Sequence, residues 1–117
     1  MGELMGLQQT GDRDLATRFK QMNLVAAGDT TEPVEMNGPF YFIARGGAGE
    51  LVLEFSMDGG TTWLDVQGPG CSSIIWSPPV QQVVPNVPRE DGVLFRVRAL
   101  TVTAGPIAVR LSSGGPL

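Results

Sequence analysis

The sequence has no histidine, and it has only one cysteine (Cys71), one lysine (Lys20) and one tyrosine (Tyr41) among its 117 residues. Without histidine, neither a Ser-His-Asp nor a Cys-His nucleophile can be assembled, and the usual zinc ligand sets are missing. Cys71 has no partner for a disulfide within the chain, and a lone thiol fits a reducing compartment such as the cytoplasm. The carboxylates are the remaining candidates for catalysis, but they are scattered along the chain and no two of them stand out as an acid–base pair. We therefore expect no catalytic residue, no cofactor and no metal site.

Charge is also scarce. Charged residues make up 17% of the chain, and 12 acidic against 8 basic residues give a net charge of −4. Because no run of Lys or Arg exists, binding to nucleic acid through its phosphates is not expected. No apolar run approaches the roughly 18 residues of a membrane span. A chain of this length fits one domain, and its low charge suits a protein that buries surface against partners.

Glycine and proline are abundant, with 16 and 9 residues, and they separate short segments of alternating apolar and polar residues. The clearest alternation covers 51–55, and a long C-terminal hairpin is expected from 93–99 and 107–111. Residues 71–77 are also expected to form a strand, whereas prolines in 80–88 indicate an edge strand or a loop. About eight such strands predict an all-β, antiparallel β-sandwich with a jelly-roll or immunoglobulin-like topology. We expect it to span 23–113, followed by a flexible C-terminal end at 114–117.

Residues 1–22 differ from the rest and are expected to form an N-terminal arm. Leu15, Phe19 and Met22 fall at helical spacing, and Asp12 or Asp14 could cap a short helix over 15–22. The arm is either a partly ordered tail or a segment that becomes ordered against a neighbouring subunit. In the second case Leu15, Phe19 and Met22 are candidate interface residues.

The stretch SMDGGTTW, residues 56–63, resembles the Asp box that recurs in sialidase propeller blades. The pattern occurs once here, whereas a propeller needs several blades of about 40–50 residues, so we interpret it as a structural hairpin. Asp58 and Ser56 are expected to accept bonds from nearby backbone N–H groups, and Gly59 and Gly60 to permit the turn. Trp63 is expected to anchor the hairpin in the core.

Three further residues are candidate interface positions. Trp76 would stack on a sugar ring or a partner if it is exposed, and would belong to the core if it is buried; a core or subunit-interface position is favoured. Arg96 and Arg98 share the polar face of one predicted strand. They are either ordinary solvated residues, ion-pair partners of Glu54 or Asp65, or contacts for acidic groups of another subunit.

Three segments taken together resemble small virion proteins of tailed bacteriophages. They are LVAAGDTTEPVEMNGPFYFIARG, LVLEFSMDGGTTWLDV and GVLFRVRALTVTAGPIAVRLS, and the similarity covers residues 24–112. The resemblance implies a compact β-sandwich on the particle, either as a head decoration (cement) protein or as part of a tail or fibre.

From this resemblance we expect a capsid decoration protein that binds the major capsid protein and copies of itself as a homotrimer, and stabilises the head lattice. Its location would be the virion, assembled in the host cytoplasm. The alternative is a tail or head-fibre module that binds a host surface glycan, for which Trp76 is the motivating residue.

Overall fold

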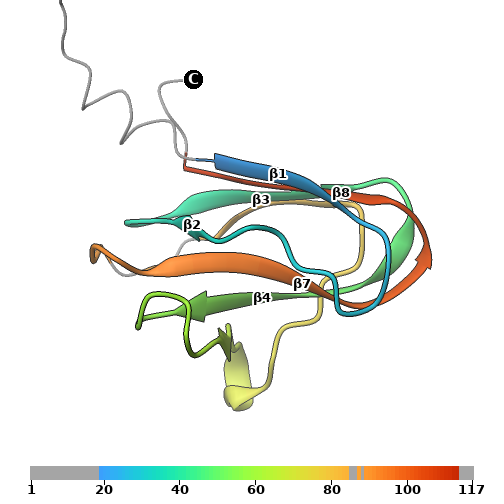
Figure 1. Ribbon diagram of the computed structural model, residues 1–117. Coiled ribbons are helices and arrows are strands. Elements are labelled where there is room, and N and C mark those ends of the chain that lie inside the picture. The colour runs from blue at the N-terminus through green and yellow to red at the C-terminus, as the bar shows by residue number, and fades with distance from the viewer. Residues whose placement is uncertain (1–18, 85–86, 88, 114–117) are drawn as a thin grey trace, which may run out of the picture.

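The computed structural model describes residues 19–84, 87 and 89–113, which form two antiparallel four-stranded sheets packed face to face (Figure 1). The strands are β1 (Phe19–Leu24), β2 (Val34–Glu35), β3 (Phe40–Arg45), β4 (Ala48–Ser56), β5 (Leu64–Asp65), β6 (Val80–Val84), β7 (Leu94–Ala104) and β8 (Ile107–Ser112), with one 3-10 turn, η1 (Pro69–Cys71), between β5 and β6. The expected all-β sandwich of about eight strands is confirmed.

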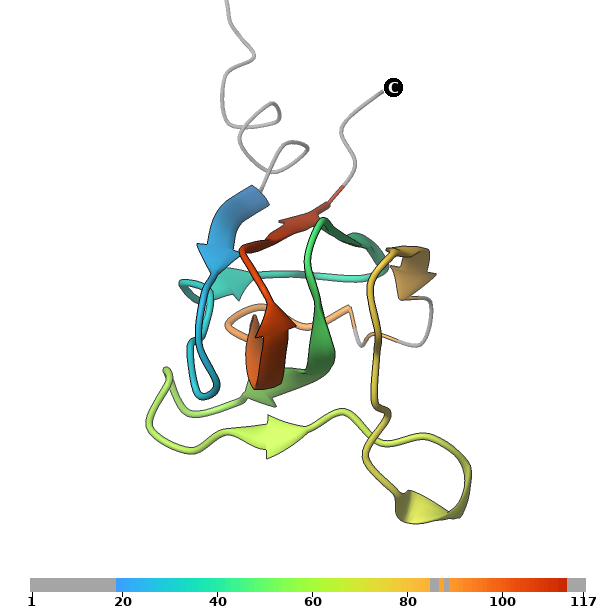
Figure 2. The same cartoon turned by 90° about the vertical axis from the view of Figure 1, so that its right-hand side faces the viewer.

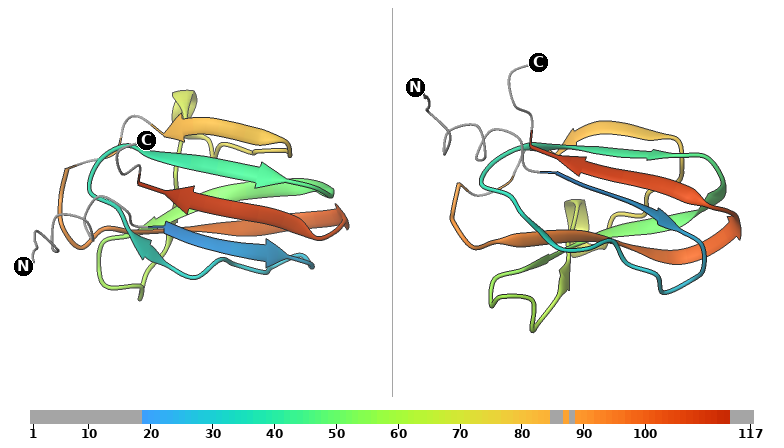
Figure 3. Two further views of the ribbon diagram at one scale, coloured as in Figure 1. Left: turned by 90° about the horizontal axis from the view of Figure 1, so that it is seen from above. Right: turned by 45° about the horizontal axis from the view of Figure 1, so that its top comes forward.

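The strand order is that of a jelly roll. One sheet, called sheet A here, has the order β1-β8-β3-β6, and the other, sheet B, has the order β2-β7-β4-β5. The first strand pairs with the last, the second with the seventh, the third with the sixth and the fourth with the fifth. This nested pairing is what results when one long hairpin is rolled into two sheets, so the jelly roll is the correct choice between the two expected topologies. Figures 2 and 3 show the two layers from the end and from above.

The core lies between the sheets and follows from the alternation in the sequence. On β3, on β8 and on β7 as far as Ala99, every second side chain is buried, and these positions face one another across the sandwich. The inward residues include Phe40, Phe42, Leu51, Leu53, Phe95, Val97, Ile107, Val109 and Leu111. The rings of Phe40 and Phe95 join the two sheets with centroids 4.8 Å apart. Burial of these side chains is the main favourable term in the folding of the domain.

A helix was expected over 15–22, and this prediction is wrong for 19–22, the part that the structure describes. Phe19 to Met22 belong to β1, which pairs with β8 from Phe19 opposite Ser112 to Leu24 opposite Ile107. A helix of about two turns is marginal alone, whereas the ladder with β8 satisfies the same backbone groups within the sheet. Met22 is 40% exposed. Leu15, the rest of the proposed arm and residues 114–117 lie outside the described residues.

The expected strand over 71–77 is also wrong. Pro69–Cys71 forms the 3-10 turn, and Cys71 is exposed with a φ of 59°. The rest of the segment makes two isolated bridges, from Ser73 to Gln67 and from Trp76 to Leu51 of β4. In contrast, β6 is an edge strand of sheet A, as its flanking prolines predict. Within the described ranges, no helix has the length and apolar character needed to cross a membrane.

Candidate functional site

The SMDGGTTW segment closes the turn between β4 and β5 through its own side chains. Ser56 Oγ donates to Asp58 Oδ1 at 2.8 Å and accepts from the N–H of Gly60 at 2.9 Å. Asp58 Oδ1 also accepts from the N–H groups of Thr61 and Thr62, at 3.1 and 2.8 Å. Gly59 and Gly60 have φ values of 78° and 97°, a region that glycine enters without strain. Ser56 and Asp58 therefore hold the turn, and Gly59 and Gly60 permit it.

These hydrogen bonds also fix the ionisation of Asp58. The backbone N–H of Thr62, then its hydroxyl, and then the hydroxyl of Ser56 lower the pKa of Asp58 from 3.8 to about 2. Donors aimed at a carboxylate stabilise its charged form. Asp58 is consequently an anion at any ordinary pH and is unsuited to donate a proton as a general acid.

Trp63 lies on the outer face of sheet B and not in the core, which corrects the expectation from the sequence. Its Nε1 donates to the carbonyl of Gly60 at 3.0 Å, and the guanidinium carbon of Arg96 lies 4.1 Å from the ring centroid. The reason is that side chains two residues apart along a strand point to the same side of the sheet. Trp63 lies two residues before Asp65, and Asp65 pairs with Glu54 on the outer side of β4. Trp63 therefore anchors the hairpin against an arginine and not against apolar side chains.

Glu54 is the centre of an ion-pair network on the same face. Its side chain is only 7% exposed, and its two oxygens accept from Nε of Arg96 and Nε of Arg98, each at 2.8 Å. Arg98 also reaches Asp65 at 3.8 Å, and Ser73 Oγ donates to Asp65 at 2.8 Å. Of the three alternatives for Arg96 and Arg98, the structure shows ion pairing within the chain. Each oxygen of the buried Glu54 carboxylate therefore accepts a hydrogen bond from an arginine, which compensates for the removal of its charge from water.

Trp76 packs against the core. Its ring meets Phe42 edge to face at 5.2 Å between centroids, and its backbone exchanges two hydrogen bonds with Leu51, at 2.8 and 2.9 Å. The indole Nε1 is buried and has no hydrogen-bond partner among the residues that the structure describes. Of the alternatives for Trp76, the core position is the one observed, and the ring is not presented as a platform for a sugar.

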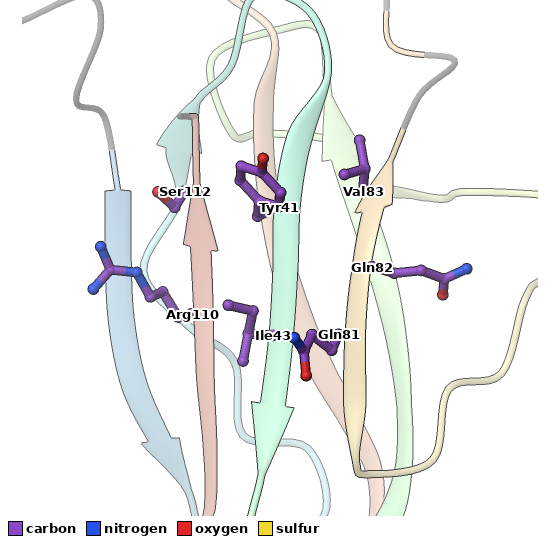
Figure 4. Close-up of a pocket in the computed structure, with 7 residues that line it drawn as sticks. All are labelled: Tyr41, Ile43, Gln81, Gln82, Val83, Arg110 and Ser112. Atoms are coloured by element: carbon purple, nitrogen blue, oxygen red, sulfur yellow. The ribbon is translucent and has the colours of Figure 1, made fainter. Parts of the chain in front are cut away.

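The outer face of sheet A is formed by the side chains of β1, β8, β3 and β6 that point away from the core (Figure 4). The outward residues are Gln21, Asn23, Tyr41, Ile43, Arg45, Gln81, Val83, Ala108, Arg110 and Ser112. Some of them line a hollow of about 430 Å³ that runs from Tyr41 and Ser112 to Gln81 and Val83. A second hollow of about 280 Å³ shares Ile43 and Arg110 with the first and extends to Gln21 and Arg45. The two hollows therefore form one continuous surface.

The chemistry of this face is apolar, amide and guanidinium, without carboxylates. Val83 is 47% exposed, while Tyr41 and Ile43 are half-buried beside it. Arg110 Nη1 donates to Gln21 at 3.3 Å. No outward position of the four strands carries Asp or Glu. None of the residues on this surface was a candidate site residue from the sequence. The alternation within β3, Phe40 and Phe42 against Tyr41 and Ile43, is the signal that separates its two sides.

No protein-family model, curated protein or solved structure matches this chain in the comparisons. In the part of the chain that the structure describes, no group of three or more Cys, Asp or Glu side chains is placed to hold a metal ion. The outer face of sheet A is the candidate functional site, because it combines exposed apolar side chains with polar groups that can bind a partner.

Proposed function

We propose that this protein is a structural component of a tailed-phage particle, a capsid decoration protein that attaches to the head lattice and stabilises it. The sequence resemblance over residues 24–112 supports this proposal. By analogy of fold, the jelly roll is compatible with it, since viral capsid proteins use this architecture.

The observation that carries the proposal is the outer face of sheet A. Its apolar and amide side chains cost less to remove from water than charged groups, and its four adjacent strands provide a continuous surface for another protein. A standard protein interface buries about 800 Å² on each partner. Many identical copies on a lattice multiply even a weak contact of this kind.

The partners in this proposal are the major capsid protein and other copies of the chain, with a homotrimer as the expected assembly. Closed cyclic assemblies are the usual outcome when identical chains associate, and threefold positions of a head lattice would accept a trimer.

Imaging of the particle tests the proposal. A reconstruction at side-chain resolution should place the jelly roll on the outer surface of the head. Particles stripped of the protein should recover it from solution, and Ile43→Asp should abolish that recovery. Ile75→Asp is a control with the same residue type, because Ile75 is 47% exposed and lies outside sheet A. Density found only at the tail tip, or the absence of the protein from virions, would overturn the proposal.

A glycan-binding module of a tail or head fibre is the second candidate. Trp76 no longer supports it, but Tyr41 lies in the hollow with Gln81 and Arg110 around it (Figure 4). An aromatic ring beside amide and guanidinium donors is a combination of groups that can bind a sugar. Some lectins are jelly rolls. A glycan array probed with the protein and with Tyr41→Ala separates the candidates: binding that Tyr41→Ala removes favours the glycan module.

A further inference from the structure

We propose that two copies of this chain pair through the free edge of β6, so that sheet A of one copy continues into sheet A of the other. The inference rests on the proposed function only in placing many copies side by side on one surface. Three observations support it: the edge of β6 carries no charge, its sequence is complementary to itself, and the surface beside it is apolar.

β6 is the one long edge strand of the described structure that carries no charged residue. The edges of sheet B, β2 and β5, are each two residues long. β1, the other edge of sheet A, carries Lys20, which lies opposite Leu111 and therefore on the inner side of the sheet. Very short strands and inward-pointing charges prevent edges from pairing with other chains. β6 has neither, because its five residues are VQQVV.

The polar residue on the inner side of β6 is Gln82. It lies opposite the buried Phe42, yet it is exposed, and Figure 4 shows its side chain directed away from β3 and beyond the edge. An amide has both donors and an acceptor, so the same residue of a second copy can be its hydrogen-bond partner. A pair centred on Gln82 would therefore place no charge at the contact.

The sequence of β6 is complementary to itself in an antiparallel pair of this kind. Gln82 lies opposite Gln82 of the second copy, Val80 lies opposite Val84, and Gln81 lies opposite Val83. Val80 and Val84 are on the inner side together with Gln82. A shift by one residue would join the inner side of one copy to the outer side of the other. The centred register keeps both outer faces of sheet A on one side, where one lattice can contact both.

Prolines select the same register. Pro79 and Pro85 flank the strand in the sequence, and proline has no N–H to donate to a ladder. In the register centred on Gln82, all five residues of β6 pair and the prolines lie beyond the two ends. A shift by two residues would place a proline opposite a residue of β6 and leave only 80–82 or 82–84 paired with each other.

The surface beside one end of β6 is apolar. Val84 lines a hollow of about 260 Å³ together with Phe55, Val66 and Phe95. Met57 also lines this hollow and is 57% exposed. Exposed apolar surface next to an unpaired edge favours contact with another protein surface.

The pair is a weak contact on its own. A ladder of five residues offers few hydrogen bonds against the translational and rotational freedom that is lost on association. It gains strength among copies already gathered on a lattice, because their local concentration is high. There it would join copies from neighbouring trimers, in addition to the contacts within each trimer.

Disulfide trapping in the purified full chain tests the inference. Gln82→Cys and the matched control Gln81→Cys are each combined with Cys71→Ser, so that each chain carries one thiol; both glutamines are exposed on the same strand. Opposed residues of an antiparallel pair have Cα atoms about 4.5–5.5 Å apart, which a disulfide can span. Gln81 and its counterpart would be about 8 Å apart, beyond the limit of about 7 Å. Under mild oxidation we expect linked dimers from Gln82→Cys on a non-reducing gel and their loss in Gln81→Cys.

Mixed chains test the register by a second route. Val83→Cys in the same Cys71→Ser background has its thiol opposite position 81 of the second copy. Chains with Val83→Cys mixed with chains with Gln81→Cys should therefore give linked dimers that neither variant gives alone.

Other outcomes overturn the inference. Equal yields from Gln82→Cys and Gln81→Cys would mean collisions without a fixed register. No dimers from Gln82→Cys would mean that the edge does not pair with itself, as expected if a strand of a different protein occupies it. Particles that carry the protein while Gln82→Cys does not link would contradict only the inference, and specific linking in a protein absent from virions would contradict only the proposed function.

Discussion

The two outer faces of this sandwich obey the same alternation but use their polar side chains differently. On sheet B, Arg96 and Arg98 meet Glu54 on the neighbouring strand, and Trp63 of the β4–β5 hairpin covers Arg96. On sheet A, Arg45 and Arg110 share a surface with apolar and amide groups, and no outward carboxylate lies among them. The arginines of sheet B therefore face carboxylates of neighbouring strands, whereas the described outward positions of sheet A include no carboxylate.

The comparison shows why counting arginines on a strand cannot identify an interface. Arg96 and Arg98 were candidate interface residues because they share one side of β7. What decides their role is the residue across the ladder: Glu54 lies opposite Arg96, and Asp65 lies opposite Glu54 on the far side. On sheet A the residue opposite Arg110 is Ile43 on one side and Gln21 on the other. For Arg96 and Arg98, the carboxylate across the ladder is what assigns the side chains to folding.

Removing the carboxylate of Glu54 should have the largest effect. In Glu54→Gln the two guanidinium groups remain close together without their shared anion. We expect the free energy of unfolding to fall by about 3 kcal/mol. This is the lower end of the range for a broken buried ion pair, because both arginines are partly exposed. Urea denaturation at neutral pH measures the loss.

The matched control is Glu50→Gln, on the same strand and the same side but exposed. Its change should remain within about 0.5 kcal/mol. Equal effects of the two substitutions would mean that the network on sheet B does not stabilise the fold, and the contrast between the faces would disappear.

Trp63→Ala should have the next largest effect, about 2 kcal/mol, from the lost contact with Arg96, the lost bond to Gly60 and the lost apolar burial. Trp63→Phe keeps the ring but not the N–H, so it should recover part of the difference in urea denaturation. A Phe variant no more stable than the Ala variant would indicate that the ring itself contributes nothing.

Asp58→Asn should show a pH dependence that identifies the charged turn. The pKa of Asp58 is lowered from 3.8 to about 2 in the folded chain, so its carboxylate contributes stability above about pH 4 that is lost as the pH falls through about 2. The gap in urea midpoint between the wild type and Asp58→Asn should therefore be constant above about pH 4 and close towards pH 2. A gap that persists unchanged at pH 2 would show that charge is not what Asp58 supplies.

The sequence allowed prediction of most of the inner face and little of the outer one. Alternation on β7 and β8 identifies the core positions because the period of two is a local property of a strand. A helix was predicted up to Met22 because Leu15, Phe19 and Met22 fall at helical spacing, but the pairing of β1 with β8, over 80 residues later, decides the conformation of Phe19 to Met22. The role of Glu54 depends in the same way on Arg96 and Arg98, 42 and 44 residues away. Long-range register is what a single sequence does not give.

The smallest effect on folding, and the sharpest test of the comparison, is expected from Ile43→Asp on sheet A. Ile43 is half-buried on the outer face of sheet A, away from the core, so the unfolding free energy should change by at most about 1 kcal/mol, the span of strand propensities. Association should nevertheless be lost, because the substitution places a charge at the centre of the contact surface, where it would have to be desolvated. Sedimentation equilibrium should show monomers for Ile43→Asp and oligomers for Ile75→Asp and for the wild type. If both substitutions leave the oligomer intact, sheet A is no more an interface than sheet B, and the association must use an edge or an end of the sandwich instead.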